Sequence, residues 1–340
     1  MRVPEVAMSG STAGHAALAG LMAVIGMAAG ALMIAAAAAG AAATSASAAE
    51  PASCQTVKMA DPGWTDITAT NAVAGTLLNA LGYQQKIETV AVPIIFQGLK
   101  TAQIDVFLGN WMPAQSTFLD KLSAEKSVEI VRPNLENAKF TLAVPKAVAD
   151  AGVHSFADLA RFGDRFEKKI YGIEPGAPAN QNIQRMLDKK DFGLEGWTLV
   201  ESSEQAMLAQ ALRRTRSKDW VVFLGWQPHP MNTRIDMTYL SGGDAYFGPN
   251  YGSTTVNTLS RRGYGNECTN AHRLFSQLVF TVGMENEIMT AITEDKKAPK
   301  DAAADYLKTH PDLLGPWLAG VSTRDGKDAT TTVRAALGLK

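Results

Sequence analysis

The chain has 340 residues, of which 46% are hydrophobic and 19% are charged. Its 32 basic side chains nearly balance its 33 acidic ones, and the formal net charge is -1. No basic surplus indicates a nucleic-acid partner, and no acidic surplus indicates a disordered chain. The length allows one large domain or two of medium size.

An uncharged stretch rich in Ala and Gly fills residues 16–43. Arg2 precedes it, and small residues at 46–48 and 47–49 form two overlapping cleavage patterns. This order is typical of a secretory signal peptide, so residues 1–49 are predicted to be removed on export. An uncleaved membrane anchor is the alternative, because the stretch is long enough to span a bilayer. No later apolar stretch is long enough to span a bilayer, so a soluble mature protein is expected.

The two cysteines, Cys54 and Cys268, both lie in the predicted mature chain. In an oxidising compartment an even pair predicts a disulfide, and two buried free thiols are the alternative. In the chain-entropy model, a loop of this length contributes up to about 5 kcal/mol. A lipoprotein is a third possibility for the N-terminus, but Pro51 stands where a lipid-modified Cys54 usually has Leu.

The mature chain alternates predicted strands and helices, and the pattern starts again near Phe140 without a repeat or a linker. Such alternation favours a parallel α/β arrangement. Strands are predicted, in chain order, at 55–60, 87–92, 104–108, 128–131, 140–144, 170–173, 198–201, 220–224, 237–240 and 254–259. Helices are predicted at 65–81, 94–102, 148–162, 180–189, 203–214, 271–278, 284–293 and 298–310.

No catalytic motif stands out in the sequence. It has no glycine-rich phosphate loop, no Gly-x-Ser-x-Gly elbow and no His-Glu-x-x-His. The five histidines show no metal-ligand spacing, and the carboxylates form no evident acid–base pair. We therefore expect no catalytic residue, no metal site and no cofactor.

Three of the six tryptophans, Trp64, Trp111 and Trp226, come two to four residues after the end of a predicted strand. Open α/β sheets bind ligands at that edge. Several aromatic faces can hold a quaternary ammonium, which has no N–H to donate. Asp66 has two possible roles, as a charge partner of such a cation or as a first-turn carboxylate of the next helix. The alternative is that the rings only pack beneath loops.

Four segments resemble the periplasmic binding proteins of glycine betaine/choline ABC transporters, and the choline-binding branch most closely. They read DPGWTDI at 61–67, GNWMP at 109–113, YGIEPG at 171–176 and GWQPH at 225–229. The resemblance implies an α/β, type II periplasmic-binding-protein fold, with two lobes and a ligand cleft between them. We predict that lobe 1 comprises residues 50–137 and 239–340, and lobe 2 residues 138–238.

The resemblance also implies an aromatic box for the ligand. Trp64 and Trp111 would come from lobe 1 and Trp226 from lobe 2, with Asp66 as the acidic partner. Phe140 stands at a box position that is commonly Tyr, so a hydroxyl is lost.

This chain departs from the family's pattern at a second position. An Asn that reaches the polar end of the ligand is replaced by Ala177, and the nearest substitutes are Asn180 and Asn182. We predict Asn180 as a ligand residue. The cysteine pair of the family resembles Cys54 and Cys268, which strengthens the disulfide prediction.

Asp66 favours a pure cation over a zwitterion, whose carboxylate it repels, and no Arg or Lys lies within the four segments. We therefore predict a monomeric periplasmic receptor that closes on choline and delivers it to the membrane permease of an ABC transporter. Alternatives are a glycine betaine or carnitine receptor of the same family, a receptor in signalling, and an exported enzyme on the same scaffold.

Overall fold

The computed structural model describes residues 50–340 of the chain. The predicted signal peptide at 1–49, with its cleavage patterns, lies outside the described residues. Among residues 50–340, every helix is too short or too polar to cross a bilayer.

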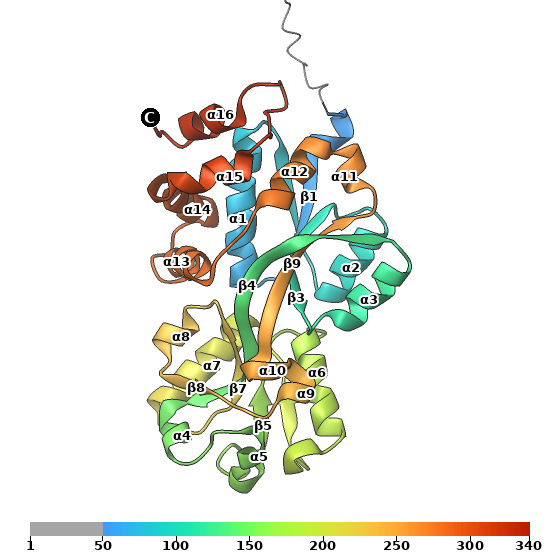
Figure 1. The fold of residues 1–340 in the computed structure, drawn as a ribbon. Helices are drawn as coiled ribbons and strands as arrows, with labels where there is room; N and C mark the ends of the chain where they lie inside the picture. The colour runs from blue at the N-terminus through green and yellow to red at the C-terminus, as the bar shows by residue number, and fades with distance from the viewer. Residues whose placement is uncertain (1–49) are drawn as a thin grey trace, which may run out of the picture. The chain divides into compact units, whose positions relative to one another are not determined.

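One mixed sheet of nine strands organises the fold (Figure 1), in the order β2-β1-β3-β9-β4-β7-β5-β6 with β8 paired to β4. Strands β1, β2 and β3 are parallel, as are β5, β6 and β7. The predicted parallel arrangement is wrong in the middle of the sheet, where β9 and β4 run antiparallel to their neighbours. The strands are β1 (Thr56–Asp61), β2 (Gln84–Thr89), β3 (Val106–Met112), β4 (Val128–Pro145), β5 (Lys169–Tyr171), β6 (Thr198–Val200), β7 (Phe223–Gln227), β8 (Met237–Tyr239) and β9 (Ser253–Arg261).

The long strand β4 joins the two lobes. The two strands predicted at 128–131 and 140–144 are one strand of 18 residues, because pairing with β9 carries the chain through the polar stretch between them. Its first part pairs with β9, and its last part pairs with β7 and β8. Figure 1 shows β4 and β9 running side by side from one lobe into the other. The two-lobed α/β fold predicted from the sequence is therefore confirmed.

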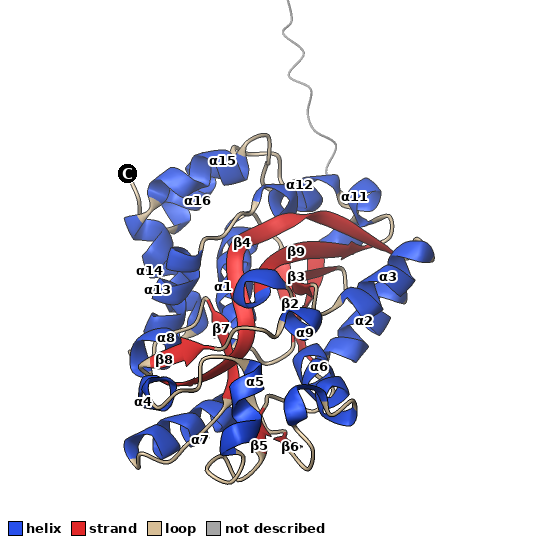
Figure 2. Ribbon diagram, turned by 60° about the horizontal axis from the view of Figure 1, so that its bottom comes forward, coloured by secondary structure: helices blue, strands red, loops and turns tan. Residues whose placement is uncertain are grey.

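Helices lie on both sides of the sheet (Figure 2). The helix predicted at 148–162 is broken in the structure. Gly152 has a φ of 103°, which ends α4, and Ser155 then forms a capping box with Asp158 that begins α5. The helices are α1 (Thr65–Ala80), α2 (Val92–Lys100), α3 (Ser116–Ala124), α4 (Lys146–Asp150), α5 (Phe156–Leu159), α6 (Pro178–Asp188), α7 (Glu204–Arg216), α8 (Met231–Arg234), α9 (Asp244–Phe247), α10 (Pro249–Gly252), α11 (Tyr264–Glu267), α12 (Thr269–Gln277), α13 (Val282–Thr293), α14 (Pro299–Thr309), α15 (Leu314–Leu318) and α16 (Ala329–Ala336).

The segment before β9 packs against elements of lobe 2. Asn182 in α6 donates from Nδ2 to the Tyr246 carbonyl over 2.8 Å, and the ring of Phe247 lies 5.1 Å from that of Phe140. These contacts favour a return of the chain to lobe 1 at β9, later than residue 239. The lobe boundaries themselves stay a prediction.

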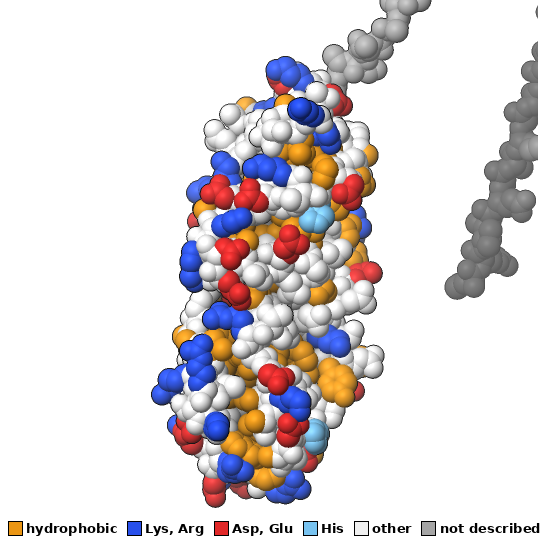
Figure 3. Space-filling view, turned by 90° about the vertical axis from the view of Figure 1, so that its left-hand side faces the viewer, with side chains coloured by type: hydrophobic (Ala, Val, Ile, Leu, Met, Phe, Trp, Pro, Cys, Tyr) orange, Lys and Arg blue, Asp and Glu red, His pale blue; other side chains and the backbone are white. Residues whose placement is uncertain are grey.

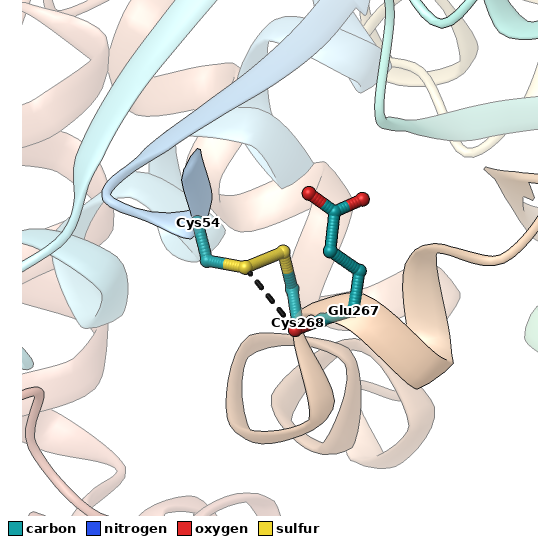
Figure 4. A group of neighbouring side chains, drawn as sticks. All are labelled: Cys54, Glu267 and Cys268. Carbon is teal, nitrogen blue, oxygen red and sulfur yellow. Dashed lines mark hydrogen bonds between the residues drawn. A yellow bond between two sulfur atoms is a disulfide. The ribbon is translucent and has the colours of Figure 1, made fainter. Parts of the chain in front are cut away.

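Cys54 and Cys268 form a disulfide with a Cα–Cα distance of 5.5 Å, as predicted (Figure 4). The bond ties the turn before β1 to the start of α12. Glu267 lies beside it, and the three side chains bring metal-ligand atom types within 4.8 Å of one another. Both sulfurs are bonded to each other in the disulfide and are not available as thiolate ligands, so this cluster does not act as a metal site.

The surface over the C-terminal helices carries both signs of charge. Figure 3 shows Lys and Arg side chains interspersed with Asp and Glu across this face. The pattern fits the near-zero net charge of the chain.

Candidate ligand-binding site

A cavity between the two lobes is lined by side chains from both. Five of the six residues predicted to bind the ligand meet there, namely Trp64, Asp66, Trp111, Phe140 and Trp226. The four rings are nearly buried, with 6–9% of each residue exposed. The remaining lining residues are Ala114, Gln115, Ile173, Pro178, Ala179 and Leu224.

The N-terminus of α1 supplies Trp64 and Asp66. After β1, the Asp61 carboxylate accepts bonds from the Gly63 backbone N–H (2.7 Å) and the Thr68 hydroxyl (2.7 Å). These bonds fix the turn, so that Trp64 stands at the N-cap and Asp66 in the first turn of the helix. Both side chains are therefore held at the edge of β1, where the sequence placed them.

Trp111 is positioned by an irregularity in β3. The pairing of β3 with β9 shifts between Phe107 and Asn110, which is the signature of a β-bulge. Gly109 lies in the bulge, and a Cβ there would come within 2.7 Å of the Ile67 Cδ1 in α1. Glycine thus allows α1 to approach β3 closely, and the bulge directs Trp111 towards the cavity.

Phe140 and Trp226 are directly opposite each other in the antiparallel pair β4–β7. Opposed residues share a face of the sheet, and Leu224, two residues before Trp226, shares it too. Trp111 and Trp226 therefore lie within strands, not beyond their ends as predicted. The predicted strands end too early, at Leu108 and Leu224. In the structure β3 and β7 continue past these residues and reach the cavity.

Asp66 is buried, and its Oδ2 accepts a bond from the Trp111 indole N–H over 3.0 Å. Burial, reinforced by the negative charge of Glu204, raises the pKa of Asp66 to about 8, although the Trp111 bond opposes this. No Lys or Arg nitrogen pairs with Asp66 among residues 50–340. A cation beside this carboxylate would stabilise its ionised form.

Glu174 is a second carboxylate beside the box, contributed by lobe 2. Its Oε1 accepts a bond from the Trp64 indole N–H over 2.9 Å, across the cleft. Burial raises the pKa of Glu174 to about 7. The Trp64 ring is thus oriented by a carboxyl oxygen at its edge, and its face stays available to the cavity.

The wall of the cavity offers few free hydrogen-bond donors. The indole N–H groups of Trp64 and Trp111 are engaged by carboxylates. The Gln115 amide donates to the Gly109 carbonyl over 2.8 Å and accepts from Asn110 over 3.2 Å. No Lys, Arg or His lines the cavity in the described part of the chain. The arrangement suits a methylated cation and provides no counter-charge for a carboxylate.

Asn180 is not among the lining residues. Its amide donates to the carbonyls of Ile173 (2.9 Å) and Glu174 (3.0 Å) and to the Glu201 carboxylate (2.9 Å), and it accepts from the Ile173 N–H (3.0 Å). It therefore fixes the loop after β5, and we leave it out of the proposed ligand set. Ala177 is buried at the N-cap of α6.

Sequence reasoning gave no role to two acidic residues beside the site. Glu174 stood in a quoted motif, but nothing in its spacing indicated a bond to Trp64, 110 residues earlier. Glu204 opens α7 and reads locally as a first-turn helix carboxylate. Its bonding partners, Thr65 and His229, lie 139 and 25 residues away in the chain.

The two-lobed mixed sheet with a ligand cavity between the lobes is the fold of a type II periplasmic binding protein. A family model for the substrate-binding domain of ABC-type glycine betaine transport systems matches residues 55–309. The chain belongs to this family, as its four motifs implied. Substrate-binding proteins of ABC importers bind small solutes for a membrane permease and are periplasmic or extracellular.

Several known proteins are similar to the chain. An ABC-transporter choline-binding protein solved in complex with choline is 51% identical, with a TM-score of 0.84, covering 85% of this chain and 100% of that one. Lactococcal OpuAC, solved with glycine betaine, is 26% identical, with a TM-score of 0.71, covering 77% of this chain and 99% of that one. An uncharacterized protein, ORF1, of Chromohalobacter salexigens is 48% identical over 130 residues, 38% of this chain and 84% of that protein.

Proposed function

We propose that the protein is a periplasmic receptor that binds choline in the cavity between its lobes and delivers it to an ABC permease. One observation carries the proposal: four nearly buried aromatic rings surround a cavity in which Asp66 is the one acidic or basic lining residue among residues 50–340. Each desolvated ring contact with a quaternary ammonium contributes roughly 2 kcal/mol. The similarity to a choline-bound binding protein supports the same ligand class.

Choline is preferred to glycine betaine because of the charges at the site. The carboxylate of betaine would lie in a cavity that holds Asp66 and no basic side chain in the described part of the chain. Its repulsion would be compensated by no basic side chain, and the donors of Trp64, Trp111 and Gln115 are already engaged within the protein. Glycine betaine is the second candidate, because the family model is that of glycine betaine transport systems and lactococcal OpuAC was solved with glycine betaine bound.

A binding role, in place of catalysis, follows from the composition of the wall. In the part of the chain that the structure describes, Asp66 is the one titratable side chain that lines the cavity, so these residues supply no nucleophile–base pair. We infer that the protein is a monomeric receptor without enzymatic activity.

Calorimetric titration of residues 50–340 with choline, glycine betaine, carnitine and tetramethylammonium tests the proposal. We expect choline to bind at least about tenfold more tightly than betaine or carnitine, the cost of an uncompensated carboxylate. Tetramethylammonium is expected within about tenfold of choline, because the wall recognises the methylated head. Preference for betaine contradicts the charge argument, and failure to bind any of the four contradicts the receptor assignment.

A further inference from the structure

A polar contact crosses the cleft next to the aromatic box without lining it. Glu204, the first residue of α7, is almost fully buried and bonds to Thr65, the first residue of α1. Its Oε2 accepts from the Thr65 backbone N–H over 3.1 Å, and its Oε1 accepts from the Thr65 hydroxyl. The two helices belong to different lobes (Figure 1).

Helix α1 lacks a side-chain cap of its own. Trp64 occupies the N-cap position, and its indole side chain accepts no bond from the backbone N–H groups of the first turn. The first N–H groups of a helix need an acceptor, and a carboxylate is the preferred one because of the helix dipole. Glu204 fills this role from across the cleft, so α1 is capped by lobe 2.

His229 holds Glu204 in place. The His229 Nδ1 accepts from the Met231 backbone N–H over 2.9 Å, so its proton lies on Nε2, 3.2 Å from the Glu204 Oε1. The imidazole thus donates to the carboxylate. The same ring packs edge-on against Trp226, with centroids 5.0 Å apart.

These contacts form a connected path between the two halves of the aromatic box. Thr65 lies between Trp64 and Asp66 in the chain, and His229 contacts Trp226. Fixing Thr65 against Glu204 therefore fixes two box residues of lobe 1 against one of lobe 2. The path exists only when the lobes are together, because the acceptor, Glu204, belongs to lobe 2 and the donors of Thr65 belong to lobe 1.

We propose that Glu204 is a positioning residue that holds the lobes closed on the ligand by capping α1 from the opposite lobe; the inference rests on the proposed function. We call the contact of Glu204 with Thr65 the latch. Ligand affinity depends on the population of the closed form, so weakening the latch weakens binding without removing a ligand contact. Because the latch forms after the ligand has entered, its loss acts on the dissociation rate.

The test compares Glu204→Gln with a matched control, Glu201→Gln. The Glu201 carboxylate bonds to Asn180, within lobe 2. Wild type is first titrated with choline, betaine and tetramethylammonium, and dissociation rates are then measured by stopped-flow Trp fluorescence. At pH 8.5 Asp66 is largely ionised, so the effect of the Glu204 charge on its pKa is smallest there. We expect E204Q to dissociate about tenfold faster at this pH, the loss of one hydrogen bond to a charged group. Its association rate and the melting temperature of its ligand-free form should match wild type, and E201Q should dissociate within about twofold of wild type.

A second variant, Thr65→Val, removes the hydroxyl donor from the other side of the cleft. In the double variant with E204Q, the two effects on dissociation should be less than additive, since both changes break one contact. A wild type that binds none of the three amines refutes the proposed function. A wild type that binds, with unchanged dissociation in both E204Q and T65V, refutes the latch alone. Should E204Q not fold, T65V decides on the same criterion.

Discussion

Replacing Asp66 by Asn removes the one carboxylate that residues 50–340 contribute to the cavity wall and keeps the shape of the cavity. The Asn carbonyl can still accept the Trp111 indole N–H that Asp66 binds at 3.0 Å. The substitution therefore tests the charge separately from the packing of the box. We expect weaker choline binding by an amount that depends on pH, because Asp66 must be ionised to attract the cation.

The magnitude follows from two opposing energies. At an effective dielectric constant of 20, opposite charges about 4 Å apart attract by about 4 kcal/mol. The pKa of Asp66 is about 8, so ionising it costs about 1.4 kcal/mol at pH 7 and about 2.7 kcal/mol at pH 6. The charge then contributes about 1.3 kcal/mol to binding at pH 6, about 2.6 kcal/mol at pH 7 and the full amount well above pH 8.

The assay is calorimetric titration of wild type and D66N with choline at pH 6, 7 and 8.5. The ratio of their Kd values should be about tenfold at pH 6, about 100-fold at pH 7, and close to its maximum at pH 8.5. The sign follows from competition between the proton and choline for Asp66, which disappears as pH rises through the pKa. Glu174, with a pKa of about 7, titrates in both proteins and largely cancels in the ratio. A ratio that does not change with pH, or that stays near one, refutes this reasoning.

Two further predictions concern the box and the disulfide. Replacing any one of Trp64, Trp111 and Trp226 by Ala should weaken choline binding about tenfold or more, the loss of one desolvated ring contact, measured by calorimetry; unchanged affinity in all three contradicts the aromatic box. Replacing Cys54 and Cys268 together by Ser should lower the free energy of unfolding by up to about 5 kcal/mol in urea titrations, because a long loop is no longer closed. Neither cysteine lines the cavity, so a Kd for choline changed more than about threefold would show that the bond shapes the site.

Much of the architecture could be predicted because it depends on local pattern. Gly152 and Ser155, however, break a helix that apolar periodicity alone continued, and the polar stretch between 131 and 140 concealed one long strand. Both errors arise where tertiary pairing or turn chemistry overrides periodicity. The antiparallel direction of β4 and β9 likewise depends on pairing across the whole chain.

Trp64, Trp111 and Trp226 could be proposed from the sequence, since large rings near strand ends with Gly or Pro beside them are conspicuous, whereas Phe140 is predicted only through the resemblance to the family. The carboxylates Glu174 and Glu204 could not. Their partners lie 110 and 139 residues earlier, and each contact forms only when the lobes meet. The contacts of Asn180 could not be predicted for a related reason. A buried amide in a loop satisfies backbone groups first, and its orientation depends on carbonyls that a sequence does not place.

The most direct test of the central claim is a crystal structure of residues 50–340 with choline bound. The account predicts the quaternary nitrogen within about 6 Å of the ring centroids of Trp64, Trp111, Phe140 and Trp226, with Asp66 as its nearest carboxylate. A choline molecule bound outside this cavity, or held in it chiefly by hydrogen bonds to its hydroxyl, would contradict it.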